Sequence, residues 1–192
     1  MGHDIGLILG AKRRPLTETA ALLAHQAHAG QVRKDDGSPY FIHPCMVAFK
    51  LAHNGFDETV VAAGFVHDVL EDTEVTKDEL ERSLGPAVVG LILPLSEDKS
   101  LPWEERKRRY IDAMRSAPEG TKAVSVADKI HNAESLLAAL ESQGPRVWDA
   151  FSRGKKQKLW FERSVLDALK EGWSHPLIEE YAQLVARLES RA

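Results

Sequence analysis

The chain has 192 residues, of which 43% are hydrophobic and 28% are charged, and this composition is typical of a globular protein rather than a disordered one. At this length we expect a single domain over residues 1–192, with a core over about 16–171 and a C-terminal helix over about 175–190. Because 29 acidic residues outnumber 25 basic ones, the net charge of −4 disfavours a protein that coats nucleic acid.

Cysteine content and hydropathy restrict the setting of the protein further. Cys45 is the only cysteine in the sequence, which excludes an intrachain disulfide and a metal site built from thiolates alone. No run approaches the roughly 20 apolar residues of a membrane span, and the basic cluster at 12–14 follows the first apolar run, the reverse of a signal peptide. We therefore expect a cytoplasmic protein that binds neither membrane nor nucleic acid, either as a monomer or as a homodimer.

The spacing of apolar residues is helical nearly throughout and predicts an all-α fold. We expect helices over about 16–29, 44–55, 57–70 and 76–85, and then over about 86–93, 102–116, 121–141, 157–171 and 175–190. Asp57 is the predicted N-cap of the third helix, and Thr76 and Glu79 form a capping box. The irregular stretch 31–43 is where we expect substrate-binding groups, because binding groups concentrate in such segments.

The helix that begins near Asp57 is apolar on all sides over residues 60–66 and is therefore predicted to be central. One imidazole and three carboxylates follow this segment: His67, Asp68, Glu71 and Asp72. At about 100° per residue, these side chains fall within about 140° of one another. Carboxylates beside a buried helix need a cation or protons, which favours a functional site over solvated acids at an exposed helix end.

Two further residues can complete a metal shell together with His67 and Asp68. His43 stands at the junction between the irregular stretch and the second helix, and Asp128 interrupts another apolar helix, with Asn132 one turn further on the same face. Two imidazoles and two carboxylates suit a divalent ion such as Mn²⁺ or Fe²⁺ that keeps positions open for water and substrate.

The remaining histidines and Cys45 have simpler interpretations. His25 and His28, three residues apart, could share a metal ion, but acidic residues are absent nearby and we interpret them as core-edge residues. Surface or hydrogen-bonded roles are expected for His53, His131 and His175. Cys45 is interpreted as a small buried side chain.

Three motifs in order resemble the hydrolase domain of the Rel/SpoT alarmone enzymes, which belongs to the HD-domain metal-dependent phosphohydrolases. The motifs are Arg33-Lys34 before Pro39-Tyr40-Phe41-Ile42-His43-Pro44, then His67-Asp68-x-x-Glu71-Asp72-Thr73, then Asp128-Lys129-x-x-Asn132. The resemblance covers about residues 20–171, and the short length is similar to that of stand-alone small alarmone hydrolases such as the metazoan SpoT homologue. A synthetase domain does not fit in this length, so we expect removal of alarmone without synthesis.

The resemblance implies an all-α HD domain that holds a metal ion, usually Mn²⁺, with Fe²⁺ or Zn²⁺ as alternatives. It assigns metal binding to His43, His67, Asp68 and Asp128. It assigns activation of the attacking water to Glu71 and Asp72. Substrate contacts are expected from Arg33, Lys34, Tyr40 and Asn132, and from Lys99 on the strength of its charge. The basic run 106–109 could also contact phosphate, although such a run is more often a solvated helix face. The aromatic residues near 155–158 are interpreted as core rather than as a nucleic-acid stacking surface, and the sequence leaves open which basic residues of 99–109 and 153–158 touch phosphate.

The implied substrate is a small nucleotide, ppGpp or pppGpp, which loses its 3′-pyrophosphate to give GDP or GTP and pyrophosphate. A metal ion would lower the pKa of bound water, and a carboxylate would accept its proton. The sequence leaves open the same chemistry on ppApp or pppApp and removal of the 2′-phosphate of NADPH. A non-catalytic nucleotide-binding module is disfavoured, because every expected ligand and the Glu-Asp pair are present.

Overall fold

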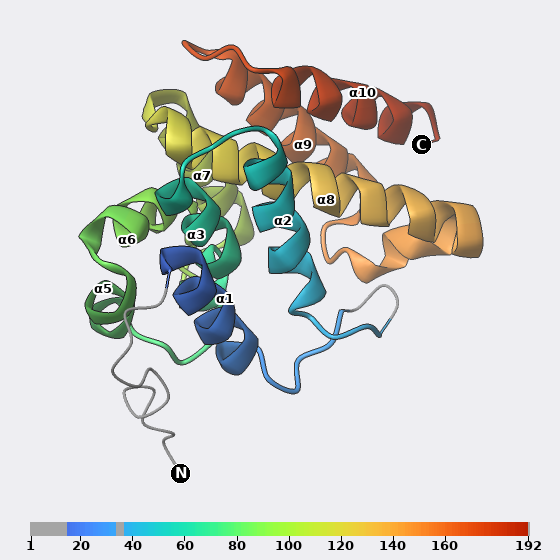
Figure 1. Ribbon diagram of the computed structural model, residues 1–192. Helices are drawn as coiled ribbons and strands as arrows, with labels where there is room; N and C mark the ends of the chain where they lie inside the picture. Colours follow the sequence, from blue (N-terminus) through green and yellow to red (C-terminus); the bar gives the residue numbers. More distant parts are fainter. Residues whose placement is uncertain (1–14, 34–36, 192) are drawn as a thin grey trace.

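The computed structural model describes residues 15–33 and 37–191, and within them the fold is all-α, as predicted (Figure 1). The first half holds α1 (Leu16–Ala27), α2 (Ile42–His53), α3 (Glu58–Val66), α4 (Val69–Asp72) and α5 (Lys77–Leu84). The second half holds α6 (Pro86–Ile92), the 3₁₀ turn η2 (Leu93–Leu95), α7 (Trp103–Ser116), α8 (Glu119–Gln143), the 3₁₀ turn η3 (Gly144–Ala150), α9 (Gly154–Lys170) and α10 (Pro176–Ser190). β pairing in the described ranges is limited to an isolated bridge between Val32 and Pro39.

Helix α3 lies at the centre, as its apolar composition predicts. It packs against α1, α2, α6 and α8, and α8 packs in turn against α2 and α10. Gly64 allows the close approach of α2 and α3, because a Cβ atom at this position would lie 2.6 Å from Leu51 Cδ1 and 3.2 Å from Ala48 Cα. Buried side chains of α10 belong to the same apolar cluster as those of α1 and α3.

The predicted N-terminal caps are confirmed. The Asp57 side chain accepts a hydrogen bond from the Val60 N–H at 3.0 Å and so satisfies one free donor at the start of α3. At the start of α5, the Glu79 N–H donates to Thr76 Oγ1 at 3.3 Å, and the Thr76 N–H donates to Glu79 Oε2 at 2.8 Å. The capping side chains of Asp57, Thr76 and Glu79 therefore fix where these two helices begin.

The predicted continuous helix over 57–70 is wrong in one respect that matters for the site. Helix α3 ends at Val66, and α4 begins at Val69, so His67 and Asp68 lie at a break between two helices. His67 Nδ1 lies 2.9 Å from the Gly64 carbonyl oxygen, the acceptor that a continuous helix would give to the N–H of residue 68. His67 and Asp68 therefore lie in a turn between α3 and α4 rather than inside one continuous helix.

Two other boundaries also differ from expectation. Helix α2 begins at Ile42, so that Pro44 lies within its first turn, where a missing N–H costs no helical hydrogen bond. Helix α9 begins at Gly154 rather than near 157, directly after η3. None of the helices in the described part of the chain combines the length and the apolar composition that a bilayer crossing requires.

Candidate metal centre and substrate pocket

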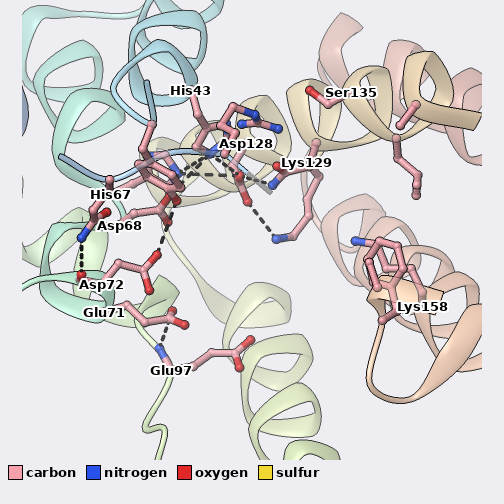
Figure 2. A pocket seen from close by; sticks show the side chains of 18 of the residues that line it. His43, His67, Asp68, Glu71, Asp72, Glu97, Asp128, Lys129, Ser135 and Lys158 are labelled. Carbon is pink, nitrogen blue, oxygen red and sulfur yellow. Dashed lines mark hydrogen bonds and ion pairs between the residues drawn. The ribbon is translucent and has the colours of Figure 1, made fainter. Parts of the chain in front are cut away.

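Side chains from α2, α4, α8 and α9 meet around a cavity of about 880 Å³ (Figure 2). One end of the cavity is lined by the residues of the break after α3, His67 and Asp68, and by His43 from the start of α2. The other end is lined by Val147 and Phe151, in and just after η3, and by Lys158 of α9. A cavity of this size accommodates a nucleotide-sized ligand.

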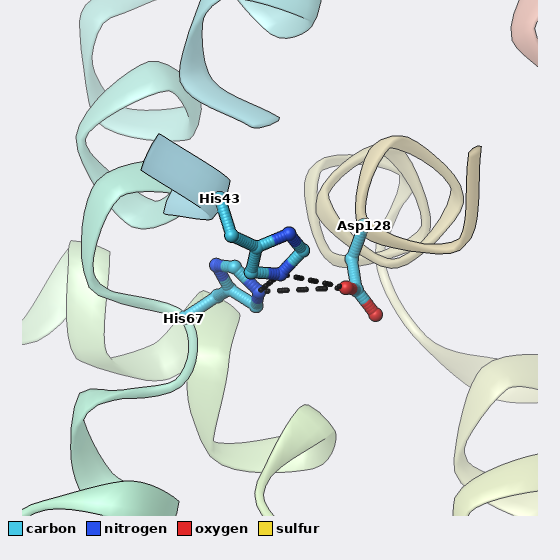
Figure 3. A group of neighbouring side chains, drawn as sticks. All are labelled: His43, His67 and Asp128. Atoms are coloured by element: carbon cyan, nitrogen blue, oxygen red, sulfur yellow. Dashed lines mark hydrogen bonds and ion pairs between the residues drawn. The ribbon is translucent and has the colours of Figure 1, made fainter. Parts of the chain in front are cut away.

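Three buried side chains from separate helical segments converge at the first end of the cavity (Figure 3). His43 Nε2 lies 3.2 Å from His67 Nε2 and 3.1 Å from Asp128 Oδ1. His67 Nε2 lies 3.6 Å from Asp128 Oδ1. The fold therefore brings together two imidazoles and a carboxylate that are 24 and 61 residues apart in the chain.

Asp68 supplies a fourth donor to this cluster. Its Oδ2 atom lies 3.4 Å from His43 Nε2 and 3.1 Å from His67 Nε2, and it accepts a hydrogen bond from the Tyr40 hydroxyl at 2.6 Å. An ion about 2.1 Å from each donor places neighbouring donor atoms about 3.0–3.4 Å apart in octahedral or tetrahedral geometry. The observed separations are close to these values, so the four side chains fit around one divalent ion.

The charges of the four groups also suit a cation. Burial acts to lower the pKa of both imidazoles, but the carboxylates of Asp68 and Asp128 outweigh it and raise the pKa of His43 and His67. Burial acts to raise the pKa of the carboxyls, yet His67 and His43 hold the pKa of Asp68 well below its usual range, and Lys129 with the imidazoles does so for Asp128. The cluster thus stabilises positive charge at its centre, which a divalent ion supplies.

Hydrogen bonds behind the imidazoles orient their Nε2 atoms toward the cluster. His67 Nδ1 donates to the Gly64 carbonyl, which leaves its Nε2 lone pair facing the other donors. His43 Nδ1 lies 2.8 Å from Nδ1 of His131, one turn after Asp128 on α8. For His43 to present a lone pair at Nε2, its Nδ1–H must donate to His131. The sequence interpretation of His131 as a surface or hydrogen-bonded residue did not include this orienting role.

Replacing His131 with alanine is expected to weaken metal binding roughly tenfold to a hundredfold, because it removes the acceptor that fixes the His43 ring. Metal titration followed by calorimetry measures this change directly. His53→Ala is the matched control, since His53 is exposed at the other end of α2. Equal metal affinity of the His131→Ala variant and the wild type would contradict the orienting role.

The predicted acid pair lies in α4, beside the cluster (Figure 2). The pKa of Glu71 is raised, chiefly by burial and further by the nearby carboxylates of Glu97 and Asp72. The Glu97 N–H, which donates to Glu71 Oε2 at 3.2 Å, acts to lower this pKa but does not outweigh the rise. Lys99 donates to Asp72 Oδ1 at 2.5 Å and to the Glu71 carbonyl oxygen at 2.8 Å. A carboxyl group with a raised pKa beside a metal cluster is suited to accept a proton from water.

Three of the residues predicted to contact substrate line the cavity, namely Arg33, Tyr40 and Asn132. The Asn132 side chain also donates to Asp128 Oδ1 at 2.5 Å. Lys34, predicted together with Arg33, lies outside the described residues. Lys99 is held by the acid pair and is absent from the described residues that line the cavity, so its location does not favour the phosphate contact predicted from its charge.

Three lysines that the sequence did not single out as site residues also line the cavity: Lys107, Lys129 and Lys158. Lys107 and Lys158 belong to the two basic stretches whose phosphate contacts the sequence leaves open. A signal was available in the sequence, because Lys107 shares its helix face with Tyr110 and Met114 rather than with the neighbouring arginines. In the structure both of these residues are buried, and the ammonium group of Lys107 donates to Glu97 Oε1 at 2.5 Å.

Comparison with known proteins defines the class of this fold and site. A family model described as the HD domain matches residues 20–153, which is most of the chain. The matched range includes all four donors of the cluster, His43, His67, Asp68 and Asp128. The chain therefore belongs to the HD-domain family, in agreement with the resemblance found in its motifs.

Individual relatives and solved structures narrow the comparison further. The guanosine-3′,5′-bis(diphosphate) 3′-pyrophosphohydrolase MESH1 of Mus musculus is 39% identical over 131 residues, which cover 67% of this chain and 73% of MESH1. The solved structure of a metazoan orthologue of SpoT that hydrolyses ppGpp superposes with a TM-score of 0.79 at 28% identity, covering 93% of this chain and 98% of that one. The structure of lmo0812 from Listeria monocytogenes EGD-e gives a TM-score of 0.73 at 38% identity, covering 77% of this chain and 99% of that one.

Proposed function

We propose that this chain is a metal-dependent hydrolase that removes the 3′-pyrophosphate of ppGpp or pppGpp, leaving GDP or GTP and pyrophosphate. The observation that carries the proposal is the four-donor cluster beside the acid pair in a nucleotide-sized cavity. The activities named for MESH1 and for the metazoan SpoT orthologue support the same reaction. The four donors and the acid pair all line this one cavity, which supports the proposal.

In the proposed mechanism, His43, His67, Asp68 and Asp128 hold the divalent ion, which when bound polarises a phosphoryl oxygen and lowers the pKa of water. Glu71 accepts a proton from the attacking water. A bond forms between the water oxygen and the phosphorus nearest the ribose, the bond from that phosphorus to O3′ breaks, and O3′ takes up a proton. No oxidant, reductant or second substrate is required for this balance.

The side chains around the acid pair and the cluster have positioning roles in this mechanism. The Lys99 ammonium donates to Asp72 Oδ1 and so fixes the direction of that carboxylate. Burial and the Asp68 carboxylate raise the pKa of the Tyr40 hydroxyl, so Tyr40 stays a neutral donor to Asp68. Arg33 offers a planar fork for phosphate and a face for a base, and Asn132 is proposed to contact the nucleoside.

We propose Mn²⁺ as the ion, because mixed imidazole and carboxylate donors with open positions suit it, with Fe²⁺ or Zn²⁺ as the alternatives. A reducing cytoplasmic setting agrees with the unpaired thiol of Cys45. Arg33 and Asn132 are proposed to contact the substrate, the first from the irregular loop and the second from α8.

The test is to incubate the purified protein with ppGpp and Mn²⁺ and to separate the nucleotides by chromatography. The proposal requires that GDP and pyrophosphate appear in equal amounts. Values of kcat/KM for ppGpp, ppApp and NADPH then rank the guanosine substrate against the two alternatives. Failure to release pyrophosphate from ppGpp with Mn²⁺, Fe²⁺ or Zn²⁺ would overturn the proposal.

A further inference from the structure

The end of the cavity furthest from the metal cluster carries a lysine whose role the proposed mechanism does not use. Lys158 lies in the first turns of α9, lines the cavity, and keeps about a fifth of its side chain exposed (22%). Figure 2 places it well apart from His67 and Asp68, with Lys129 between them. We therefore consider Lys158 for a part of the substrate other than the phosphate group next to the metal ion.

The Lys158 ammonium is held from behind by a buried carboxylate. Glu162, one turn later on α9, is only 1% exposed, and its Oε1 atom accepts a hydrogen bond from Lys158. A buried carboxylate is costly unless it is paired and hydrogen-bonded, so its presence here indicates a specific requirement. Burial acts to raise the pKa of Glu162, but Lys158 and Lys129 outweigh it and lower this pKa.

The carboxylate is in turn fixed by the C-terminal helix. The Tyr181 hydroxyl of α10 lies 2.5 Å from Glu162 Oε2 and 3.1 Å from the Glu162 carbonyl oxygen, and Tyr181 is completely buried. The three residues therefore form a chain from the core of α10 through α9 to the cavity. All three lie beyond residue 153, where the match to the HD-domain model ends.

The geometry leaves donors of Lys158 directed at the cavity. An ammonium group has three N–H donors, and Glu162 takes one of them. The nearest aromatic surface, the Phe151 ring, lies 5.6 Å from Nζ and provides an apolar wall beside the charge. A fixed cation with spare donors at the far end of a nucleotide-sized cavity suits a phosphate group on the other side of the ribose from the one that is cleaved.

We propose that Lys158, positioned by Glu162 and Tyr181, binds the 5′-phosphate groups of the nucleotide; this inference rests on the proposed function. The Lys158 side chain touches the substrate, whereas Glu162 and Tyr181 act through it. The C-terminal helix thereby contributes to substrate affinity although it contacts the substrate at no point.

Steady-state kinetics of the Lys158→Met variant test the proposal with two substrates, ppGpp and a guanosine 3′-diphosphate that lacks 5′-phosphates. The KM for ppGpp is expected to rise about tenfold or more, the scale of one charge-assisted hydrogen bond, while kcat changes less than about twofold. The KM for the substrate without 5′-phosphates should not change. Lys158→Arg should restore most of the affinity for ppGpp, and Lys170→Met is the control on the same helix.

The positioning residues have their own readout. Tyr181→Phe and Glu162→Gln are expected to raise KM for ppGpp about twofold to fivefold, again without effect on the substrate that lacks 5′-phosphates. If these residues had a purely structural role, their replacement would lower kcat or would raise KM equally for both substrates. Lys158→Met leaves the buried Glu162 carboxylate without its ammonium partner and could unfold the protein. The double variant Lys158→Met with Glu162→Gln removes this unpaired charge and should show the same rise in KM for ppGpp.

Binding of GDP and of guanosine, measured by calorimetry, separates this inference from the proposed function. If the wild type fails to hydrolyse ppGpp, the proposed function falls, but a loss of GDP affinity without a loss of guanosine affinity in Lys158→Met still supports the phosphate contact. Equal effects on the two substrates, or none on either in a folded variant, would overturn the role of Lys158.

Discussion

Replacing Asp128 with asparagine is expected to remove both bound metal and hydrolytic activity, with kcat/KM falling by roughly a thousandfold or more. Asp128 Oδ1 lies within 3.6 Å of both His43 Nε2 and His67 Nε2, so this one carboxylate completes the cluster. Asparagine has nearly the same shape but lacks the charge, and a bound ion is what lowers the pKa of water from about 15.7 toward 7. Elemental analysis and ppGpp hydrolysis measure the two effects in one preparation.

The design includes a matched carboxylate far from the cavity. Asp167→Asn makes the same chemical change at an exposed position of α9 and is expected to keep full metal content and activity. A thermal unfolding curve for Asp128→Asn distinguishes a lost ligand from a lost fold. If this variant stays folded, takes up one ion per chain and turns over at the wild-type rate, the assignment of the metal centre is wrong.

Glu71→Gln is expected to separate metal binding from turnover. The glutamine keeps the size of the side chain and the hydrogen bond from the Glu97 N–H, but it cannot accept a proton from water. General-base catalysis contributes about a hundredfold to ten-thousandfold, so kcat should fall by at least about a hundredfold while the metal content stays at one ion per chain. Metal analysis and single-turnover hydrolysis of ppGpp measure the two quantities.

The control for this variant is Glu74→Gln, which removes a carboxylate from the exposed loop just after α4. It should leave both kcat and metal content unchanged. Loss of metal in Glu71→Gln would make Glu71 a ligand rather than a base, and an unchanged kcat would transfer the proton-accepting role to another group such as Asp72.

Most of the fold could be predicted from the sequence, because local features decide it. The all-round apolar segment at 60–66 predicts a central helix, and α3 is buried between α1, α2, α6 and α8. Asp57 and the pair Thr76 and Glu79 fix the start of their helices through contacts within one turn. The two imidazoles and two carboxylates stand out for the same reason, since polar groups in apolar helices are costly without a partner.

The features that could not be predicted depend on contacts between distant segments or on competition within a turn. The break at His67 arises because its side chain takes the Gly64 carbonyl, and regular helical spacing gives no sign of this. The role of His131 in orienting the His43 ring depends on the packing of α8 against the start of α2, which joins residues 88 positions apart. Lys158 lines the cavity and pairs with Glu162 on α9, which in turn bonds Tyr181 on α10, and the sequence around Lys158 gives no sign of these contacts.

The tight crossing of α2 over α3 at Gly64 makes the metal centre mechanically dependent on a residue that bears no functional group. His43 stands five positions before Ala48, the point on α2 nearest to Gly64, or about 7.5 Å further along the helix axis. A change in the tilt of α2 at this crossing would therefore move the His43 imidazole relative to that of His67. A Cβ atom at position 64 would therefore be expected to disturb the metal centre.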